Sequence, residues 1–458
     1  MRITKAYDEY VDSGLAWVGH YPKLWNLTKV KYEAYVKARV GWHGLKSDDF
    51  TEEGPYLVTG TDFKGDSINW NDCYHCNIER YEQDPYIQLR NGDLLITKDG
   101  TIGKVALVEN LEKNDKATLN SGVFVVRPLS RNLATKFYFW LLQSKVFKDF
   151  VDFYKTGSTI LHLYQDTFVN FIYATPSLTE QTRIATFLNY ETARIDRLIV
   201  KQQQLIELLK EKRLAVISHA VTKGLNPYVP MKDSGVEWLG HVPEHWASIR
   251  VKQVSTFITS GPRGWSDFIS ENGEEVFLQS GDLNNELGLE LDKAKRVTPP
   301  KNTEGVRTKL IDGDVVVCIT GANTGRVAIV ENLSRTTYIN QHLSLIRPLT
   351  SKISSKYLGF SLASSGGRSF FDVVQYGLKE GLSLSNICEV PIALPPIDEQ
   401  HQIAKHIESK NIYFDKLTSF AIHQVDLLRE RRTALISAAV SGKIDLRGWT
   451  PRAEEGAA

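Results

Sequence analysis

The sequence DSGLAWVGHYPKLW at residues 12–25 returns as DSGVEWLGHVPEHW at residues 233–246. Eight of the fourteen positions are identical, and the second stretch lies 221 residues after the first. Together the two stretches hold four of the nine tryptophans in the chain. Composition alone does not produce a match of this length, so the chain contains an internal repeat.

The repeat continues through each half of the chain. Residues Gly92–Leu95 correspond to Gly313–Val316, and Gly103–Asn110 correspond to Gly325–Asn332. Further on, ISHAV at residues 217–221 corresponds to ISAAV at residues 436–440, now 219 residues apart. Solenoid repeats have periods of about 20–50 residues. A period this much longer predicts two copies of a whole module.

The length and composition agree with a duplicated globular protein. The chain has 458 residues, of which 42% are hydrophobic and 24% charged, as in ordinary soluble proteins. No apolar run reaches the ~20 residues that span a bilayer, and the N-terminal region lacks the apolar core of a signal peptide. Four cysteines do not form a disulfide framework, so a cytoplasmic location is expected. The net charge of +1 does not discriminate between partners.

Each half begins with a globular domain of mixed α/β (α+β) type. Short β-branched runs separated by turn residues predict strands at residues 93–97, 104–108 and 122–126, and again at 314–320, 326–330 and 343–347. One helix is expected at residues 136–150. The predicted organisation is a first domain at 1–175, a long helix at 176–222, a linker at 223–232, a second domain at 233–395, a second long helix at 396–442, and a tail at 443–458.

Both long helices follow prolines. A capping-box pattern starts the first one at Ser177–Glu180, and Asp398 is the expected N-cap of the second. A narrow stripe of apolar side chains needs a partner in water, so we expect an antiparallel coiled coil between the helices. The alternative is that each helix packs only on its own domain. The predicted seam consists of Ile184, Leu188, Ile195, Leu198, Leu205, Leu209, Ile403, Ile407, Phe414, Leu417, Leu428 and Leu435.

The two halves diverge in specific places. They do not align convincingly across residues 30–90 and 251–311, nor across the loops at 98–102 and 320–324. The repeated tryptophans are therefore expected to pack within the scaffold, whereas the divergent surfaces are expected to bind. A duplicated scaffold with different surfaces suits a protein that reads two different things at a fixed separation.

These motifs together resemble the specificity subunit of type I restriction–modification systems. The resemblance covers the Trp-rich opening, the Gly-Asp strand followed by Gly-(Lys/Arg)-Val-Ala, the Glu180-Gln181 and Glu399-Gln400 helix starts, and the SGKID sequence at residues 441–445. It implies two target-recognition domains held apart by two antiparallel helices, in a pseudo-cyclic arrangement. In that arrangement residues 1–12 take the place that the linker at 222–232 fills before the second copy.

The resemblance also implies a function. The subunit would have no catalysis of its own and would bind an asymmetric bipartite site in double-stranded DNA. It would position two methyltransferase subunits and, in the full complex, restriction-translocase subunits, so that the complex has DNA adenine methyltransferase and ATP-dependent endonuclease activities. Two readers on a rigid rod could dock about one helical turn apart. Two other classes stay open: the specificity part of a split or fused nuclease–methylase, and a coiled-coil adaptor that binds proteins and not DNA.

Catalytic motifs do not fit. Asn226-Pro227-Tyr228 lacks the second proline of a methyltransferase motif, and neither Gly103-Lys104 nor Gly325-Arg326 has the spacing of a phosphate-binding loop. Cys73 and Cys76 make half of a zinc site, without a second pair nearby, so two ordinary thiols are expected. No cofactor and no metal are expected.

Candidate DNA contacts are basic, polar and aromatic residues of the divergent segments, since such side chains contact phosphates and base edges. The alternative for any one of them is an ordinary surface or turn residue. In the first half they are Lys37, Arg39, Trp42, His43, Lys46, Lys98, Asp99, Thr101, Lys104, Lys155, Thr156 and Ser158. In the second half they are Arg263, Trp265, Ser266, Thr320, Asn323, Arg326, Tyr376 and Lys379.

Overall fold

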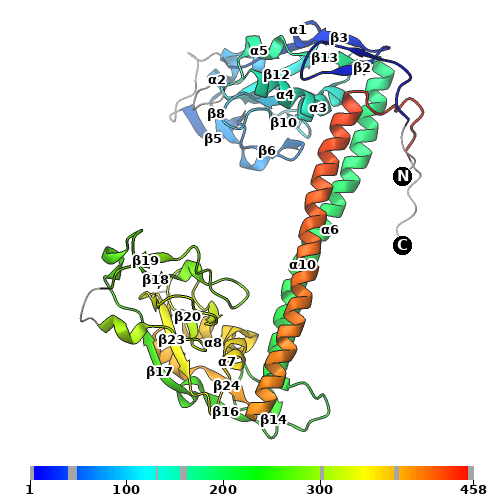
Figure 1. Ribbon diagram of the computed structural model, residues 1–458. Coiled ribbons are helices and arrows are strands. Elements are labelled where there is room, and N and C mark those ends of the chain that lie inside the picture. Colours follow the sequence, from blue (N-terminus) through cyan, green and yellow to red (C-terminus); the bar gives the residue numbers. More distant parts are fainter. Residues whose placement is uncertain are drawn as a thin grey trace. The chain divides into compact units, whose positions relative to one another are not determined.

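The fold comes from a computed structural model, which describes residues 5–39, 49–129, 133–154, 162–299, 304–375 and 381–451. The chain divides into two compact units (Figure 1). The first unit is built from two separate stretches of sequence, and the second from one continuous stretch. The first unit comprises Met1–Gln202 and His423–Ala458, and the second comprises Gln203–Ile422. Within the described ranges, no helix is both long and apolar enough to cross a membrane.

The first unit contains a globular domain and one end of each long helix. Its helices are α1 (Val30–Glu33), α2 (Ile78–Gln83), α3 (Thr135–Gln143), α4 (Lys145–Phe153), α5 (Gln165–Val169) and the start of α6 (Leu178–Lys223). Its strands are β1 (Tyr10–Asp12), β2 (His20–Pro22), β3 (Asn26–Lys29), β4 (Ala34–Lys37), β5 (Phe50–Val58), β6 (Phe63–Lys64), β7 (Ser67–Ile68), β8 (Tyr74–Cys76), β9 (Leu94–Thr97), β10 (Val105–Leu107), β11 (Ala117–Leu119), β12 (Val123–Pro128) and β13 (Ile172–Thr175).

The central sheet of the first unit has the strand order β4-β12-β9-β10-β7-β6. Its strands alternate between two cores, as the two-residue period of a strand requires. Leu94 and Ile96 of β9 pack into a core with α3 and α4, whereas Leu95 packs into a second core with the β11-β5-β8 sheet. Both faces are covered, which is why these strands are continuous apolar runs.

The second unit repeats this design. Its helices are α7 (Ser355–Ala363), α8 (Ser365–Val374), α9 (Leu384–Glu389) and the start of α10 (Ile397–Val440). Its strands are β14 (Met231–Asp233), β15 (His241–Pro243), β16 (Ala247–Arg250), β17 (Ser255–Ser260), β18 (Glu275–Leu278), β19 (Lys295–Val297), β20 (Val315–Cys318), β21 (Val327–Ile329), β22 (Thr337–Ile339), β23 (Leu343–Pro348) and β24 (Pro391–Leu394).

The central sheet of the second unit, β17-β23-β20-β21, corresponds to β4-β12-β9-β10 of the first. The smaller sheets also correspond, because β5 pairs in parallel with β11 and β18 pairs in parallel with β22. Strands β5 and β18 lie in the regions that do not align by sequence. The mixed α/β class and the tandem duplication predicted from sequence are thus present, and the duplication extends further than the sequence showed.

The helix expected at residues 136–150 is two helices. It breaks at Ser144, whose backbone is extended with φ −81° and ψ 165°, between α3 and α4. The hydroxyl of Ser144 donates a hydrogen bond to the carbonyl of Leu141 at 2.7 Å. The second unit breaks at the corresponding Ser364, so the sequence repeat marked a turn that apolar periodicity missed.

The repeated Gly-Asp motif holds a buried carboxylate. Asp93 is 2% exposed and pairs with Arg127 of β12 at 2.6 Å, and Asp314 is fully buried and pairs with Arg347 of β23 at 2.8 Å. Each aspartate also accepts a hydrogen bond from a backbone N–H three residues before it. A buried charge is tolerated only with such partners. The motif therefore serves the frame of each domain.

The repeated Glu-Gln start of each long helix also serves the frame. Gln181 is 2% exposed and accepts a hydrogen bond from the Ala134 N–H at 2.8 Å, and Gln400 is fully buried and accepts one from the Ser354 N–H at 2.8 Å. The glutamate before each accepts a hydrogen bond from the indole N–H of a repeated tryptophan, Trp25 or Trp246. Each helix start is thereby fixed to its own domain.

The starts of the helices differ in one detail from the sequence-based prediction. The Glu180 N–H donates to the Ser177 hydroxyl at 3.4 Å, as half of a capping box does. The second helix begins at Ile397, so Asp398 lies in its first turn and is not the N-cap. An acidic residue in the first turn still interacts favourably with the helix dipole.

The end of each long helix contacts the other domain. In the second unit the Ser218 hydroxyl near the end of α6 accepts a hydrogen bond from the Ser365 N–H at the start of α8, at 2.8 Å. In the first unit the Ser437 hydroxyl near the end of α10 accepts one from the Lys145 N–H at the start of α4, at 3.0 Å. The repeated serines thus satisfy exposed N–H groups at two helix starts.

The helices α6 and α10 pack side by side in both units (Figure 1). Most of the predicted seam residues lie buried or half-buried: Ile184, Leu188, Ile195, Leu209, Ile403, Ile407, Phe414, Leu417, Leu428 and Leu435. The prediction was wrong for Leu198 and Leu205, which are 40% and 42% exposed. Ile199 and Ile206 are half-buried instead, because the step after Ile195 is four residues rather than three.

The two ends of the chain come together within the first unit. The Asp445 N–H donates to the Lys5 carbonyl at 2.8 Å, and the Tyr10 hydroxyl donates to the Gly442 carbonyl at 2.9 Å. Strand β1 then pairs with β2, as β14 pairs with β15 after the linker in the second unit. The N-terminal segment therefore has the structural place that the linker has in the second copy.

Candidate nucleic-acid interface

Three segments meet at one edge of the central sheet in the first unit. They are the loop after β9 (residues 98–104), the turn between β11 and β12 (residues 120–122) and the described segment from residue 162 that leads to α5. The Lys98 N–H donates to the Gly122 carbonyl at 2.9 Å, and the Leu163 N–H donates to the Lys98 carbonyl at 2.8 Å. We call these three segments the first reading edge.

The second unit has the same arrangement. The Ile319 N–H donates to the His342 carbonyl at 2.9 Å, and the Leu382 N–H donates to the Ile319 carbonyl at 2.7 Å. The loop after β20 (residues 319–325), the turn between β22 and β23 (residues 340–342) and residues 381–383 form the second reading edge. Backbone hydrogen bonds hold both edges together, so their side chains can change without loss of the arrangement.

The side chains at the two edges differ. The carboxylate of Asp99 in the first edge contacts Nδ1 of His162, and the backbones of these two residues form an isolated β-bridge. At the position of Asp99 the second edge has Thr320, which contacts Nδ1 of His342, and Gln341 lies with its Nε2 atom 3.1 Å from Nε2 of that histidine. Donors and acceptors of this kind read base edges in DNA complexes.

The sequence missed His162, Gln341 and His342. Each lies in a segment that is distant in sequence from the loop it contacts, so local patterns gave no reason to choose it. The repeat did offer a signal. Asn120 and Asn340 occupy corresponding turns, and the residues that follow them change from Ser-Gly to Gln-His.

Several predicted residues of the reading loops lie at the two edges. Thr101 and Lys104 are exposed, and the Lys98 ammonium lies 5.5 Å from the centre of the Phe124 ring. In the second unit Asn323 donates to the Ser280 carbonyl at 3.1 Å, and Arg326 donates to the Leu283 carbonyl at 2.8 Å. The arginine keeps further N–H groups for a ligand, since its guanidinium has five donors.

Two predicted contacts are corrected by the structure. Arg39 is 2% exposed and forms an ion pair with Asp84 at 2.8 Å, so its charge is used inside the domain. Burial lowers the pKa of Arg39, and Asp84 counteracts this effect. Trp265 is 4% exposed and packs with Phe277 and Tyr338 in a small core. Residue type predicted DNA contacts at both positions, whereas both side chains are buried inside their domains.

The remaining predicted contacts divide into two groups. Lys37, Arg263 and Ser266 are exposed and take no part in the backbone hydrogen bonds that build the reading edges. The others fall outside the described residues: Trp42, His43, Lys46, Lys155, Thr156, Ser158, Tyr376 and Lys379.

Cys73 and Cys76 are buried. Burial raises the pKa of the Cys73 thiol to about 12, with a further contribution from Asp62, and burial also raises the pKa of Cys76. Across the described ranges, no group of three histidine, cysteine or acidic residues could hold a metal ion.

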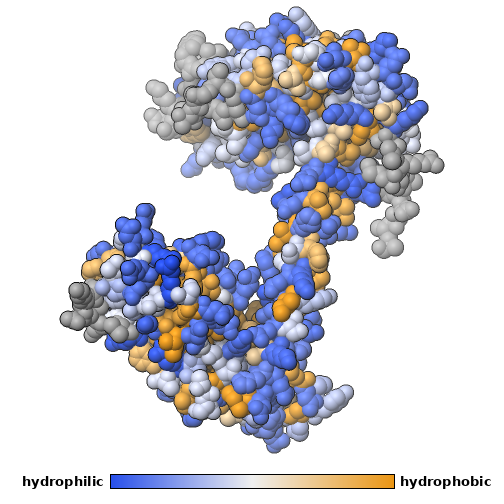
Figure 2. All heavy atoms as spheres, viewed as in Figure 1, coloured by the Kyte–Doolittle hydropathy of each residue, from blue (hydrophilic) through white to orange (hydrophobic). Residues whose placement is uncertain are grey.

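The helix pair exposes apolar side chains. On the second-unit part of the pair, Tyr413 and Phe420 of α10 are 58% and 67% exposed, and Leu208 of α6 is 60% exposed. Figure 2 shows hydrophobic residues exposed on the helix pair. Tyr413 and Phe420 are seven residues apart and so lie on one face of α10. Large exposed apolar patches are typical of protein interaction sites, so this part of the helix pair is a candidate surface for a protein partner.

Comparison with known proteins agrees across sequence and structure. The curated type I restriction enzyme EcoBI specificity subunit of Escherichia coli is 21% identical over 77% of this chain and 73% of its own length. The MjaVIII specificity subunit of Methanocaldococcus jannaschii is 21% identical over 93% of this chain and 94% of its own length.

Solved structures share the fold. A chain from a structural study of the assembly and conformational transition of the type I restriction–modification system has a TM-score of 0.69 at 16% identity, over 93% of this chain and 99% of that one. The HsdS subunit from Thermoanaerobacter tengcongensis has a TM-score of 0.52 at 16% identity, over 93% of this chain and 98% of that one. The type I restriction modification DNA specificity domain model matches residues 44–208 and 243–419, one match in each half. The chain therefore belongs to the type I restriction modification DNA specificity domain family.

Proposed function

We propose that this chain is the DNA target-recognition subunit of a type I restriction–modification system. The observation that carries the proposal is the pair of reading edges, which have the same backbone hydrogen bonds and different side chains. Two readers that share a frame and differ in their polar side chains suit an asymmetric target with two unlike half-sites. Membership of the family supports the same reading.

The subunit acts by positioning other proteins. Its partners are methyltransferase subunits and, in the full complex, restriction-translocase subunits, which carry the catalysis. Exposed Tyr413 and Phe420 on α10, together with Leu208 on α6, offer an apolar surface for such a partner. Each large apolar side chain that passes from water into a protein interface contributes up to about 1.5–3 kcal/mol, which adds to the contacts made elsewhere on the partner.

Methylome sequencing tests the proposal. The chain is expressed with its cognate methyltransferase in a host without other adenine methylation, and the modified sites are read from the genome. Two unlike half-sites separated by a nonspecific spacer are expected. A continuous motif, a perfect palindrome, or assembly with the methyltransferase without any DNA binding would contradict the proposal, the last result favouring a protein-binding adaptor.

A further inference from the structure

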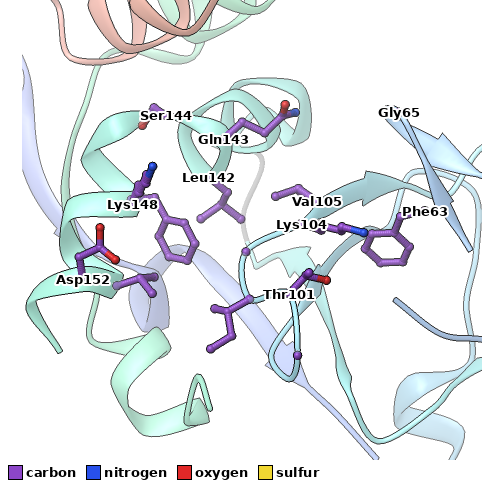
Figure 3. Close-up of a pocket in the computed structure, with 15 residues that line it drawn as sticks. Phe63, Gly65, Thr101, Lys104, Val105, Leu142, Gln143, Ser144, Lys148 and Asp152 are labelled. Atoms are coloured by element: carbon purple, nitrogen blue, oxygen red, sulfur yellow. The ribbon is translucent and has the colours of Figure 1, made fainter. Parts of the chain in front are cut away.

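A cavity of about 650 Å³ lies beside the first reading edge. Its walls are the loop at residues 100–105, the end of α3, the first turns of α4, and Phe63 with Gly65 from the β6–β7 hairpin. Figure 3 shows Lys148 of α4 on one side of the cavity and Lys104 on the other, with Thr101 on the same loop as Lys104. The floor is apolar and includes Leu142 and Phe147.

The two lysines are available for a ligand. Both side chains are exposed, and neither forms an ion pair or side-chain hydrogen bond with another residue in the described ranges. Asp152 also lines the cavity, one helical turn after Lys148. The cavity therefore combines two cations from separate elements with one carboxylate and hydroxyl groups of Thr101 and Ser144.

The same pair of cations occurs in the second unit. Arg326 takes the place of Lys104 after the repeated glycine, and Arg368 takes the place of Lys148 in the first turn of the helix after the repeated serine. Arg368 lies close to the loop, since a Cβ atom on Gly325 would be 3.5 Å from its Nη1 atom. Gly103 and Gly325 have φ values of +84° and +82°, so both loops turn in the left-handed region.

The residues beside the two reading edges are of two kinds: some change between the units and others keep their charge. Asp99 and Thr320 differ in chemistry, and the histidine that each contacts comes from a different segment of its reading edge, His162 in the first and His342 in the second. The cations at 104 and 326, and at 148 and 368, keep their charge. Base-reading residues must differ when two half-sites differ, whereas the phosphate charge is the same in every sequence.

Other basic residues of the helices α3, α4 and α7 do not follow this pattern. Lys145, one turn before Lys148, pairs with Asp149 at 2.6 Å, and serine replaces it at residue 365. Lys136 and Lys356 are repeated, but Lys356 pairs with Glu331 at 3.2 Å and Lys136 lies 3.9 Å from Glu109. Compared with these three lysines, the cations at 104 and 326 and at 148 and 368 are both repeated and without an ion pair in the described ranges.

We propose that Lys104 with Lys148, and Arg326 with Arg368, bind phosphate groups of the DNA backbone beside each half-site, independently of base sequence. The inference rests on the proposed function. In each unit the loop cation and the helix cation bind the backbone from two sides, and the neighbouring reading edge then meets the bases in a fixed register.

Salt-dependent binding tests the proposal. The intact complex with methyltransferase is assembled with the wild-type chain, Lys148→Ala, Arg368→Ala and the double variant, and binding to duplexes with the cognate site and with a scrambled site is measured from low to moderate salt. Each lost phosphate contact reduces the slope of log affinity against log salt by about 0.9. The double variant should lose about twice this slope, and the loss of affinity should be equal for both duplexes.

Two further variants make the result specific. Lys148→Arg keeps the charge and should restore the slope, and Lys145→Ala removes an exposed but paired lysine from the same helix and should leave the slope unchanged. If the wild-type complex prefers its cognate duplex and the slope of the double variant is unchanged, the phosphate proposal is overturned and the proposed function still stands. A loss confined to the cognate duplex would also overturn it, since it would make these residues base readers. A wild-type complex without any preference would instead contradict the proposed function.

Discussion

Arg432 on α10 pairs with Asp196 on α6, with 3.1 Å between Nε and Oδ1. Their counterparts 219 residues away, Arg213 on α6 and Asp415 on α10, also form an ion pair, in the second unit. The acid and the base have exchanged helices, as expected when two copies of one helix pair in antiparallel orientation. The internal repeat is therefore present in the contacts of the helix pair as well as in the domains.

The helix seam gives the first prediction. Ile195 is 2% exposed, so Ile195→Asp places an unpaired charge in the core and should lower the free energy of unfolding by more than about 3 kcal/mol. Leu198→Asp, three residues later and 40% exposed, should change it by less than about 0.5 kcal/mol. Urea denaturation of the two variants measures both. Equal losses would mean that Leu198 lies in the seam after all.

The buried glutamine gives the second prediction. Gln400→Ala leaves the Ser354 N–H and the carbonyls of Lys352 and Pro395 without their hydrogen bonds, at a cost of about 2–4 kcal/mol. The matched control is Gln402→Ala, which changes an exposed glutamine two residues further along the same helix. Denaturant titration should separate the two variants clearly. Similar stabilities would remove the frame role assigned to the repeated Glu-Gln motif.

The third prediction concerns pH and thiol reactivity. The pKa of Cys73 is raised to about 12 in the folded protein, so the folded state keeps a proton that the unfolded state loses near pH 9. Its contribution to stability is full below pH 9 and falls as the pH rises from 9 towards 12. At pH 8 Cys73 should react with iodoacetamide far more slowly than the less buried Cys388, as mass spectrometry would show. Equal labelling would contradict the burial of Cys73.

The sequence predicted the framework better than the binding surface. The repeat marked Asp93, Gln181 and Ser437 because each holds a contact that both halves need. The seam slipped by one residue at Leu198, since leucine and isoleucine are neighbours there and hydrophobicity does not choose between them. Arg39 and Trp265 were misread because charge and aromatic character do not reveal burial. His162 and His342 depend on contacts between distant segments, which only the fold brings together.

A half-length chain gives the fourth prediction. Residues 1–222 contain both Lys145 and Ser218, and in the intact chain the Ser218 hydroxyl binds the residue that corresponds to Lys145. Two copies of the half-chain can therefore exchange these contacts and should form a two-fold dimer. Light scattering would give its mass. With methyltransferase, the dimer should modify a palindrome made of one parental half-site. Retention of the asymmetric parental motif would contradict this, because one reader cannot specify two sequences.

The independence of the two reading edges is the central claim, and the methylation motif tests it directly. His162→Ala and His342→Ala are each placed in the full-length chain, and the methylome is sequenced beside that of the wild type. His162→Ala should relax or change one half-site only, and His342→Ala should relax or change the other half-site only, with the spacer length unchanged in both. Changes in the same half-site, or in both half-sites at once, would contradict two separate readers on a common frame.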